Sequence, residues 1–307
     1  SEAKTSAALD AGNTDASKQV LAATTEGMKT TTKETAARRR SLRRSLLATP
    51  QEEAQALRAS VVANLWSTYA ITPVTQADVA SLLDVLAGVV DTPAEVTDAT
   101  AASALSFVTT VLTDSKTAGV GVSAAAADLV GTALSNLFDC DYFGATGGAT
   151  SYAAASDALA ALRLASANQL FGALDGVGVA LGSGDVDLLS YRGTAGDLST
   201  LGTLALSGGG SADGTTAVTF DADAQAAVIA SGSLSTDDVL DLRVGTLASN
   251  VYAYALEGTS GSDAAVESRL DQTGGALSGN TLLRSKLTVV EVAAQDSSSA
   301  LSLSSLA

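Results

Sequence analysis

The sequence contains no histidine, and this absence removes the commonest route to enzyme chemistry. Its 307 residues include no histidine and one cysteine. Histidine is the side chain whose ordinary pKa of about 6.5 allows proton transfer near neutral pH. Ser-His-Asp and Cys-His catalysis and histidine-ligated metals are therefore excluded within these residues. No Gly-x-Ser-x-Gly nucleophile elbow occurs either, so we expect a protein that is not an enzyme and needs no cofactor.

Cysteine, aromatic residues and long apolar runs are also scarce. Cys140 cannot form a disulfide within the chain, and its flanking aspartates disfavour a reactive thiolate, so we expect a loop or small core cysteine; a disulfide to another chain is the alternative. Aromatic residues make up only 4% of the chain, so Leu, Val and Ala must fill the core. No run approaches the roughly 20 apolar residues that span a bilayer, and any membrane attachment is expected through segments outside this chain.

Positive charge is scarce outside the first part of the chain. Residues 1–58 hold ten Lys and Arg against seven Asp and Glu, and residues 59–307 hold seven against twenty-six. The two parts therefore carry net charges of +3 and −19. An acidic body repels phosphate backbones, so we expect no nucleic-acid partner and instead cations, basic partners or other protein subunits.

Residues 1–49 lack sustained apolar periodicity and are predicted to form an extended, partly disordered or partly helical basic lead-in. This segment ends in a run of five arginines: Arg38, Arg39, Arg40, Arg43 and Arg44. Because these charges are clustered, the run is a candidate polyanion-binding, acidic-lipid-binding, processing or phosphorylation segment. A solvated linker is the alternative.

Residues 50–175 show the period of amphipathic helices. The Thr-Pro pairs at 72–73 and 92–93 break the pattern, because the residue before a proline avoids the α region. Five helices are predicted. The first runs from Gln51 to about Ala70, and the fifth from about Ser151 to Leu174. Between them, the second is capped by Thr75 with Asp78 as its reciprocal partner, the third is capped by Thr97, and the fourth starts near Ser123.

Residues 176–307 change to short, glycine-punctuated apolar runs. Alternating or continuous apolar residues bounded by turn residues are typical of strands. The predicted strands are Val186–Arg192, Leu201–Leu206, Ala217–Phe220, Val239–Val244, Asn250–Leu256, Leu287–Val292 and Ala300–Leu303. Since strands and helices do not alternate, we expect an α+β fold, with an all-helical subdomain followed by an antiparallel β-sandwich.

Pairs of acidic residues are the remaining candidates for metal binding or catalysis. Calcium accepts all-oxygen ligand sets, and carboxylates alone can run glycoside hydrolysis. The candidate residues are three aspartate pairs: Asp185 with Asp187, Asp221 with Asp223, and Asp237 with Asp238. None has the spacing of an EF-hand loop, and the strand region has few aromatics to stack on sugars. An acidic secreted or surface-layer calcium-binding protein and a carboxylate-only hydrolase therefore stay as alternative hypotheses.

The order of helices and Thr-Pro breaks over Arg58–Leu112 resembles that of a known family. Its features are Ala56-Leu-Arg-Ala-Ser-Val-Val62, the two Thr-Pro breaks and a Val-x-x-Leu-Leu-x-x-Leu helix, followed later by Ala217-Val-Thr-Phe220, Val239-Leu-Asp-Leu-Arg-Val244 and Asn250-Val-Tyr-Ala253. This order is similar to that of polycystin-like ectodomains, in which receptor-for-egg-jelly modules merge into a GAIN domain before the membrane. The resemblance covers about residues 52–306.

The resemblance implies a GAIN-like fold and a non-enzymatic module. Its expected role is structural support or protein interaction in a large cell-surface or extracellular assembly, with a ciliary membrane as one location. Members of that family usually end this fold with a His-Leu-Ser/Thr cleavage motif and paired cysteines, which this sequence lacks. Self-cleavage of that kind is therefore not expected within these residues.

Overall fold

A computed structural model describes residues 14–38, 49–140, 149–171, 178–183, 186–201, 203–206, 216–247 and 287–295. Its helices are α2 (Thr14–Arg38), α3 (Pro50–Tyr69), α4 (Gln76–Val89), α5 (Asp98–Thr117), α6 (Ala124–Phe138), α7 (Ala149–Leu170) and α8 (Ala222–Gly232), with short 3₁₀ turns η1 (Pro93–Glu95) and η3 (Ala195–Thr200). Its strands are β1 (Gly178–Ser183), β2 (Val186–Thr194), β3 (Thr203–Leu206), β4 (Thr216–Thr219), β5 (Val239–Leu247) and β6 (Leu287–Ala294).

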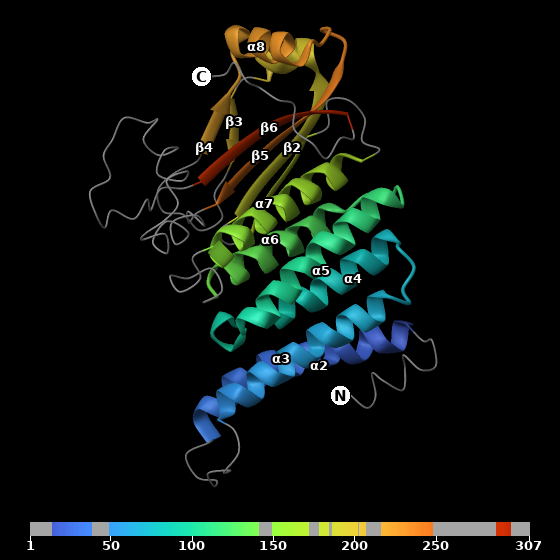
Figure 1. Cartoon of the computed structure of the whole chain (residues 1–307), viewed down its shortest axis with the longest axis vertical. Coiled ribbons are helices and arrows are strands. Elements are labelled where there is room, and N and C mark those ends of the chain that lie inside the picture. Colours follow the sequence, from blue (N-terminus) through green and yellow to red (C-terminus); the bar gives the residue numbers. More distant parts are fainter. Residues whose placement is uncertain are drawn as a thin grey trace, which may run out of the picture.

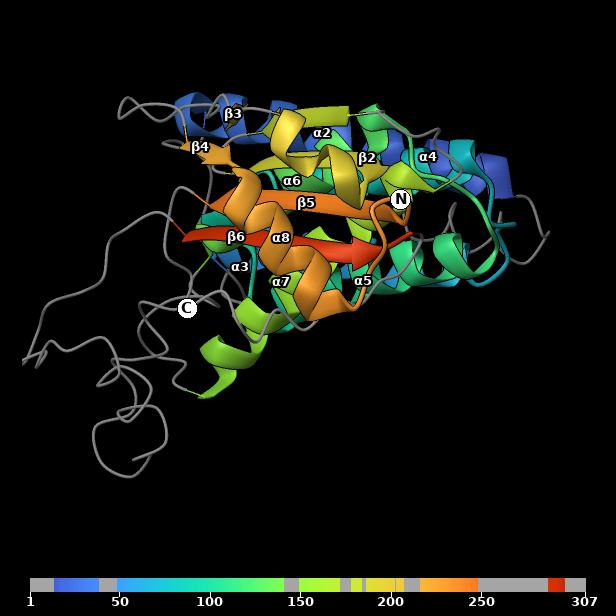
Figure 2. The same cartoon turned by 90° about the horizontal axis from the view of Figure 1, so that it is seen from above.

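The helices stack in pairs beneath a sheet (Figure 1). Helices α2 and α3 form the outermost layer, α4 and α5 the next, and α6 and α7 the layer that touches the sheet. The sheet has the strand order β1-β2-β5-β6 with every pair antiparallel, and β3 and β4 form a separate two-stranded sheet. Helix α8 lies over the opposite face of the larger sheet (Figure 2).

The predicted helix starts are confirmed as N-caps. The hydroxyls of Thr75, Thr97 and Ser123 accept hydrogen bonds from the backbone N–H of the third residue of α4, α5 and α6, respectively. The reciprocal bond predicted from Asp78 is not formed, because the Thr75 hydroxyl donates to that carboxylate instead. Thr49 and Glu52 make a full capping box at the start of α3.

Two cores fill the spaces between the layers. The larger core joins α2–α7 to Val186, Leu188 and Leu247 on one face of the sheet. The smaller core lies on the other face, where leucines and valines of β2, β5 and β6 meet Phe220 and Val228. Since successive strand residues point to opposite faces, each central strand contributes to both cores.

The structure shows an α+β fold, as predicted, with a helical part followed by an antiparallel sheet. A β-sandwich is not seen among the described residues, because a helix, α8, lies between β4 and β5 where strands alone were expected. Strand β1 was not among the predicted strands. The strands predicted at 250–256 and 300–303 lie outside the described residues.

The basic lead-in contains helix α2, and a partly helical segment was one of the forms predicted for it. One side of its first half is buried, through Ser17, Lys18, Leu21, Thr25 and Met28. The Ser17 and Thr68 hydroxyls lie 2.9 Å apart, and Lys18 pairs with Asp78 of α4. Residues 1–13 and 39–48 lie outside the described residues.

Candidate functional site: a charged joint between helix α7 and the sheet

The sheet carries a group of charged residues on the face that packs against α6 and α7. Register places Arg192 of β2 opposite Asp241 of β5, and Arg243 of β5 opposite Glu291 of β6. All four residues are buried, with 0–6% of their surface exposed. We call these four residues, together with Arg163 of α7, the charged joint. Burial of so many charges is costly unless they are paired.

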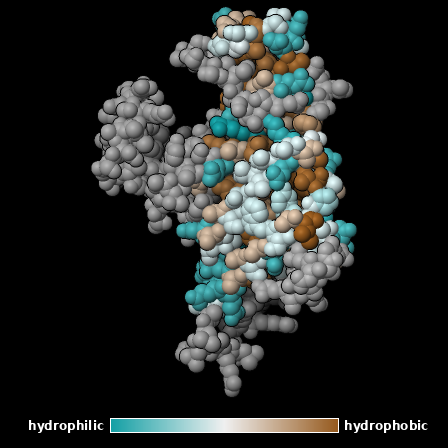
Figure 3. All heavy atoms as spheres, turned by 45° about the vertical axis from the view of Figure 1, so that its right-hand side comes forward, coloured by the Kyte–Doolittle hydropathy of each residue, from teal (hydrophilic) through white to brown (hydrophobic). Residues whose placement is uncertain are grey.

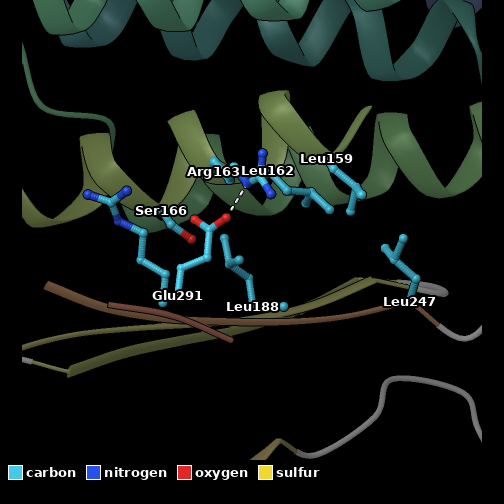
Figure 4. Close-up of a pocket in the computed structure, with 9 residues that line it drawn as sticks. Leu159, Leu162, Arg163, Ser166, Leu188, Leu247 and Glu291 are labelled. Atoms are coloured by element: carbon cyan, nitrogen blue, oxygen red, sulfur yellow. Dashed lines mark ion pairs between the residues drawn. The ribbon is translucent and has the colours of Figure 1, made fainter. Parts of the chain in front are cut away.

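The pairing is direct. Arg192 donates from Nε to Asp241 Oδ1 at 2.7 Å and from Nη2 to Asp241 Oδ2 at 3.0 Å, the two-pronged geometry in which a guanidinium matches a carboxylate. Arg243 Nη2 lies 3.6 Å from Asp241 Oδ2, so this carboxylate serves two arginines. Across the layer boundary, Arg163 of α7 forms an ion pair with Glu291 (Figure 4).

Burial dominates the electrostatics of Arg243. Desolvation lowers the pKa of its guanidinium, and the charges of Asp241 and Glu291 oppose that shift. An arginine stays protonated at neutral pH even when its pKa falls somewhat. Arg243 therefore contributes a fixed positive charge to the joint.

A small cavity lies within this interface. It has a volume of about 20 Å³ and is lined by apolar side chains of α7, β2 and β5 together with Arg163, Ser166, Arg243 and Glu291. Figure 4 shows the Ser166 hydroxyl and the Glu291 carboxylate facing one another across the gap between α7 and the sheet. A site of this size has room for a single water molecule and no organic substrate.

A third buried arginine, Arg58, joins parts of the helical layers. Arg58 of α3 has none of its surface exposed; its Nε and Nη2 donate to Glu95 Oε2 at 3.0 and 2.8 Å, and its Nη1 donates to Asp91 Oδ1 at 3.0 Å. It also donates to the Val89 carbonyl at the end of α4. One side chain thus holds the α4–α5 connection against α3.

The arginine run predicted as a binding segment is only partly within the described residues. Arg38 is the last residue of α2, and Arg39, Arg40, Arg43 and Arg44 lie outside those residues.

Two of the six aspartates predicted as calcium ligands accept hydrogen bonds from backbone N–H groups. Asp221 caps α8 by accepting from the Ala224 N–H at 2.8 Å, and Asp238 accepts from the Ser235 N–H at 2.8 Å. Asp187 is buried in β2 opposite Thr246, and Asp185 lies outside the described residues. Across the described part of the chain, no three or more His, Cys, Asp or Glu residues gather closely enough to hold a metal.

Sequence reasoning missed the charged joint although its signal was present. Asp241 and Arg243 stand two residues apart in a predicted strand, and Arg192 and Glu291 occupy predicted strands on either side. Residues two apart share a face, so the pattern indicates one charged face. What packs on that face depends on the register and on α7, which no single strand reveals.

Cys140 follows the end of α6 and is 3% exposed, as expected for a core cysteine.

Large exposed hydrophobics are few in the described ranges. They are only Ile71 and Val290, at 45% and 42% exposed, and the face seen in Figure 3 mixes polar and apolar groups. None of the described helices combines the length and apolar character needed to cross a membrane.

No protein-family model matches the sequence, and comparison with curated proteins finds no match.

Proposed function

We propose that this chain is a non-enzymatic structural and interaction module of a large cell-surface or extracellular assembly, of the polycystin-like, GAIN-type kind. The observation that carries the proposal is the charged joint, in which Arg192 and Arg243 pair with Asp241 inside the sheet and Arg163 of α7 pairs with Glu291 of β6. Such pairs add less stability than apolar packing would, but they tolerate few alternative arrangements of the elements they join. That property suits a spacer or docking platform, which must hold its shape.

Other buried charges support the same reading. Arg58 ties α3 to the α4–α5 connection, and Lys18 ties α2 to α4. Each of these cations bridges different elements instead of facing an open cleft. The charged side chains of the interior thus serve to set the geometry of the stack.

We extend the proposal to the arrangement of the two sheets. Val218 of β4 is partly buried and packs against the smaller core, which includes leucines and valines of the larger sheet. Contact of this kind between two sheets is how a β-sandwich is built. We infer that the pair β3–β4 is the start of the second sheet.

The net charge of each part of the chain indicates the kind of partner it would bind. With −19 on residues 59–307, the folded body favours basic surfaces of other subunits and disfavours nucleic acid. The arginine run at 38–44 offers the opposite charge, suited to a polyanionic partner or to processing. Membrane attachment would come from segments outside this chain.

The test is display of the full chain on a eukaryotic cell through an added membrane anchor, with an epitope tag at each end. We expect intact chain at the surface, with Cys140 unreactive to maleimide until denaturant is added, because its side chain is buried. Retention inside the cell, or disulfide-linked oligomers through Cys140, would contradict the surface role.

A matched activity screen covers the enzymatic alternative. The purified chain and an Asp221→Asn/Asp223→Asn variant are compared on glycoside and ester substrates. Turnover by the wild-type chain that disappears in the variant would overturn the non-enzymatic assignment.

A further inference from the structure

The positive charges that follow helix α2 lie mostly in the interior of the fold. In the described residues after α2 they are Arg58, Lys116, Arg163, Arg192 and Arg243. Arg58, Arg192 and Arg243 are buried, with 0–3% of their surface exposed. Arg163 forms an ion pair with Glu291. These arginines therefore neutralise carboxylates inside the fold and contribute little positive charge to its surface.

Carboxylates, by contrast, remain on the surface. Within the described residues after α2, no ion pair joins the following exposed carboxylates to Lys or Arg: Glu52, Glu53, Asp84, Asp98, Asp157, Asp197, Asp221, Asp223, Asp237 and Asp238. Asp221 and Asp238 accept hydrogen bonds from backbone N–H groups. Such bonds orient a carboxylate but do not cancel its charge, so the surface of this part is predominantly negative.

The ends of the helices show the same imbalance. A cation in the last turn of a helix offsets the negative end of the helix dipole. Lys116 of α5 is such a cation, whereas the last turns of α3, α4, α6, α7 and α8 contain no basic residue. Most helix ends after α2 therefore add to the negative potential of the folded body.

We propose that the fold is salt-dependent, because salt screens the repulsion among its surface carboxylates. Folding brings these charges closer together than they are in the expanded unfolded chain. The Debye length shortens from about 30 Å at 0.01 M salt to about 3 Å at 1 M, and buried pairs such as Arg192–Asp241 are screened much less than exposed charges. Salt thus removes repulsion and keeps the charged joint. The inference is independent of the proposed function.

Attraction between the basic lead-in and the acidic body does not reverse the effect. Residues 1–58 carry +3 and residues 59–307 carry −19. Repulsion within the acidic part grows with the square of its charge, whereas the attraction grows with the product of the two charges, so repulsion is larger by roughly threefold at equal distances. Screening of both leaves a net gain in stability, and the fold suits a medium of substantial ionic strength.

The test is urea denaturation of the full chain at about 0.02 M and about 0.5 M NaCl, with chelator present in both. Urea is uncharged and adds no screening of its own. We expect the urea midpoint to rise by roughly 0.5–1 M between the two salt concentrations.

A series of charge variants identifies the cause. Asp84, Asp157 and Asp237 are exposed and lie within α4, within α7 and in the loop before β5. All three are replaced by Asn in one variant and by Lys in another. The salt dependence of the midpoint should fall from wild type to the Asn variant to the Lys variant, since repulsion falls with net charge. Ser67→Ala, which removes an exposed hydroxyl and no charge, is the control and should keep the full salt dependence.

Three outcomes would overturn the proposal. The first is a midpoint that stays constant or falls as NaCl rises. The second is a Lys variant with the salt dependence of wild type, because a general salting-out effect would then be the cause. The third is stabilisation by NaCl but not by tetramethylammonium chloride at the same ionic strength, which would indicate a bound sodium ion instead of screening.

Discussion

Arg192 and Arg163 illustrate how exposure sets the value of an ion pair at the scale of single residues. The partners Arg192 and Asp241 have side chains 1% and 0% exposed, so water screens neither charge. The side chain of Arg163 is 46% exposed, and its pair with Glu291 is partly solvated. Loss of a partner should therefore cost far more at Asp241 than at Arg163.

Asp241→Asn should lower the free energy of unfolding by about 3–5 kcal/mol, the usual cost of removing one partner of a buried pair. The amide keeps the shape of the side chain but leaves Arg192 and Arg243 without the carboxylate that serves both. Urea denaturation at neutral pH measures the change. Asp223→Asn, at an exposed position of α8, is the control and should stay within about 0.5 kcal/mol of wild type. Equal midpoints for the two variants would show that the joint adds nothing.

Among the elements, α2 has few large apolar anchors. Its large buried apolar side chains are Leu21 and Met28, whereas α5 buries five. Full burial of one such side chain contributes about 1.5–3 kcal/mol, so polar contacts decide whether α2 stays docked. The ion pair of Lys18 with Asp78 is the main one.

Acidification should undock α2. Burial alone would raise the pKa of Asp78, but hydrogen bonds from Lys18 and Thr75 and the charge of Lys18 outweigh it and lower the pKa below 3.8. A lowered carboxyl pKa adds stability that is present above 3.8 and is lost as the pH falls through the folded-state pKa. The methyl NMR signal of Met28, the only methionine, reports the docking and should move toward its unfolded position below that pH.

Asp78→Asn should show the same Met28 signal shift already near neutral pH. Asp84→Asn is the matched control, since Asp84 is an exposed aspartate of the same helix. A Met28 signal that responds equally in both variants would exclude Asp78 as the acid-sensitive group.

The elements were predictable where local chemistry defines them. A hydroxyl before an amphipathic run located the starts of α4, α5 and α6, because N-capping is a short-range interaction. Helix α8 was missed: Val228 is its only fully buried residue, so it has almost no apolar stripe. Helix α2 was predicted only as part of a partly helical lead-in, because its sequence, rich in threonine and alanine, has no sustained apolar periodicity. The charged joint was missed because it exists only where three strands and α7 meet.

At the scale of the whole molecule, calcium should not stabilise the described fold. Asp221 and Asp238 already accept backbone N–H bonds at α8 and at the following turn. Tm measured by calorimetry should therefore be the same in millimolar calcium and in excess chelator, with magnesium as the control for ionic strength. A rise in Tm specific to calcium would restore the surface-layer hypothesis.

The stack of layers should unfold as one unit. Trp66, the only tryptophan, packs edge-on against Phe107 with ring centroids 5.1 Å apart, so its fluorescence reports the α3–α5 contact. Amide hydrogen exchange in β5 reports the sheet. Because the larger core and the charged joint connect these layers, both probes should give one urea midpoint, as a cooperative transition requires.

Glu291→Gln is the decisive variant for that cooperativity, because Glu291 of β6 forms the ion pair with Arg163 of α7 across the layer boundary. If the joint transmits stability between the layers, the β5 amides should lose protection at lower urea than Trp66 changes its fluorescence, because the helical layers keep their own core without the sheet. Asp223→Asn should keep the two midpoints together. Separate midpoints in the wild-type chain would instead mean that the helical layers and the sheet are independent units, and the rigid-module proposal would lose its physical basis.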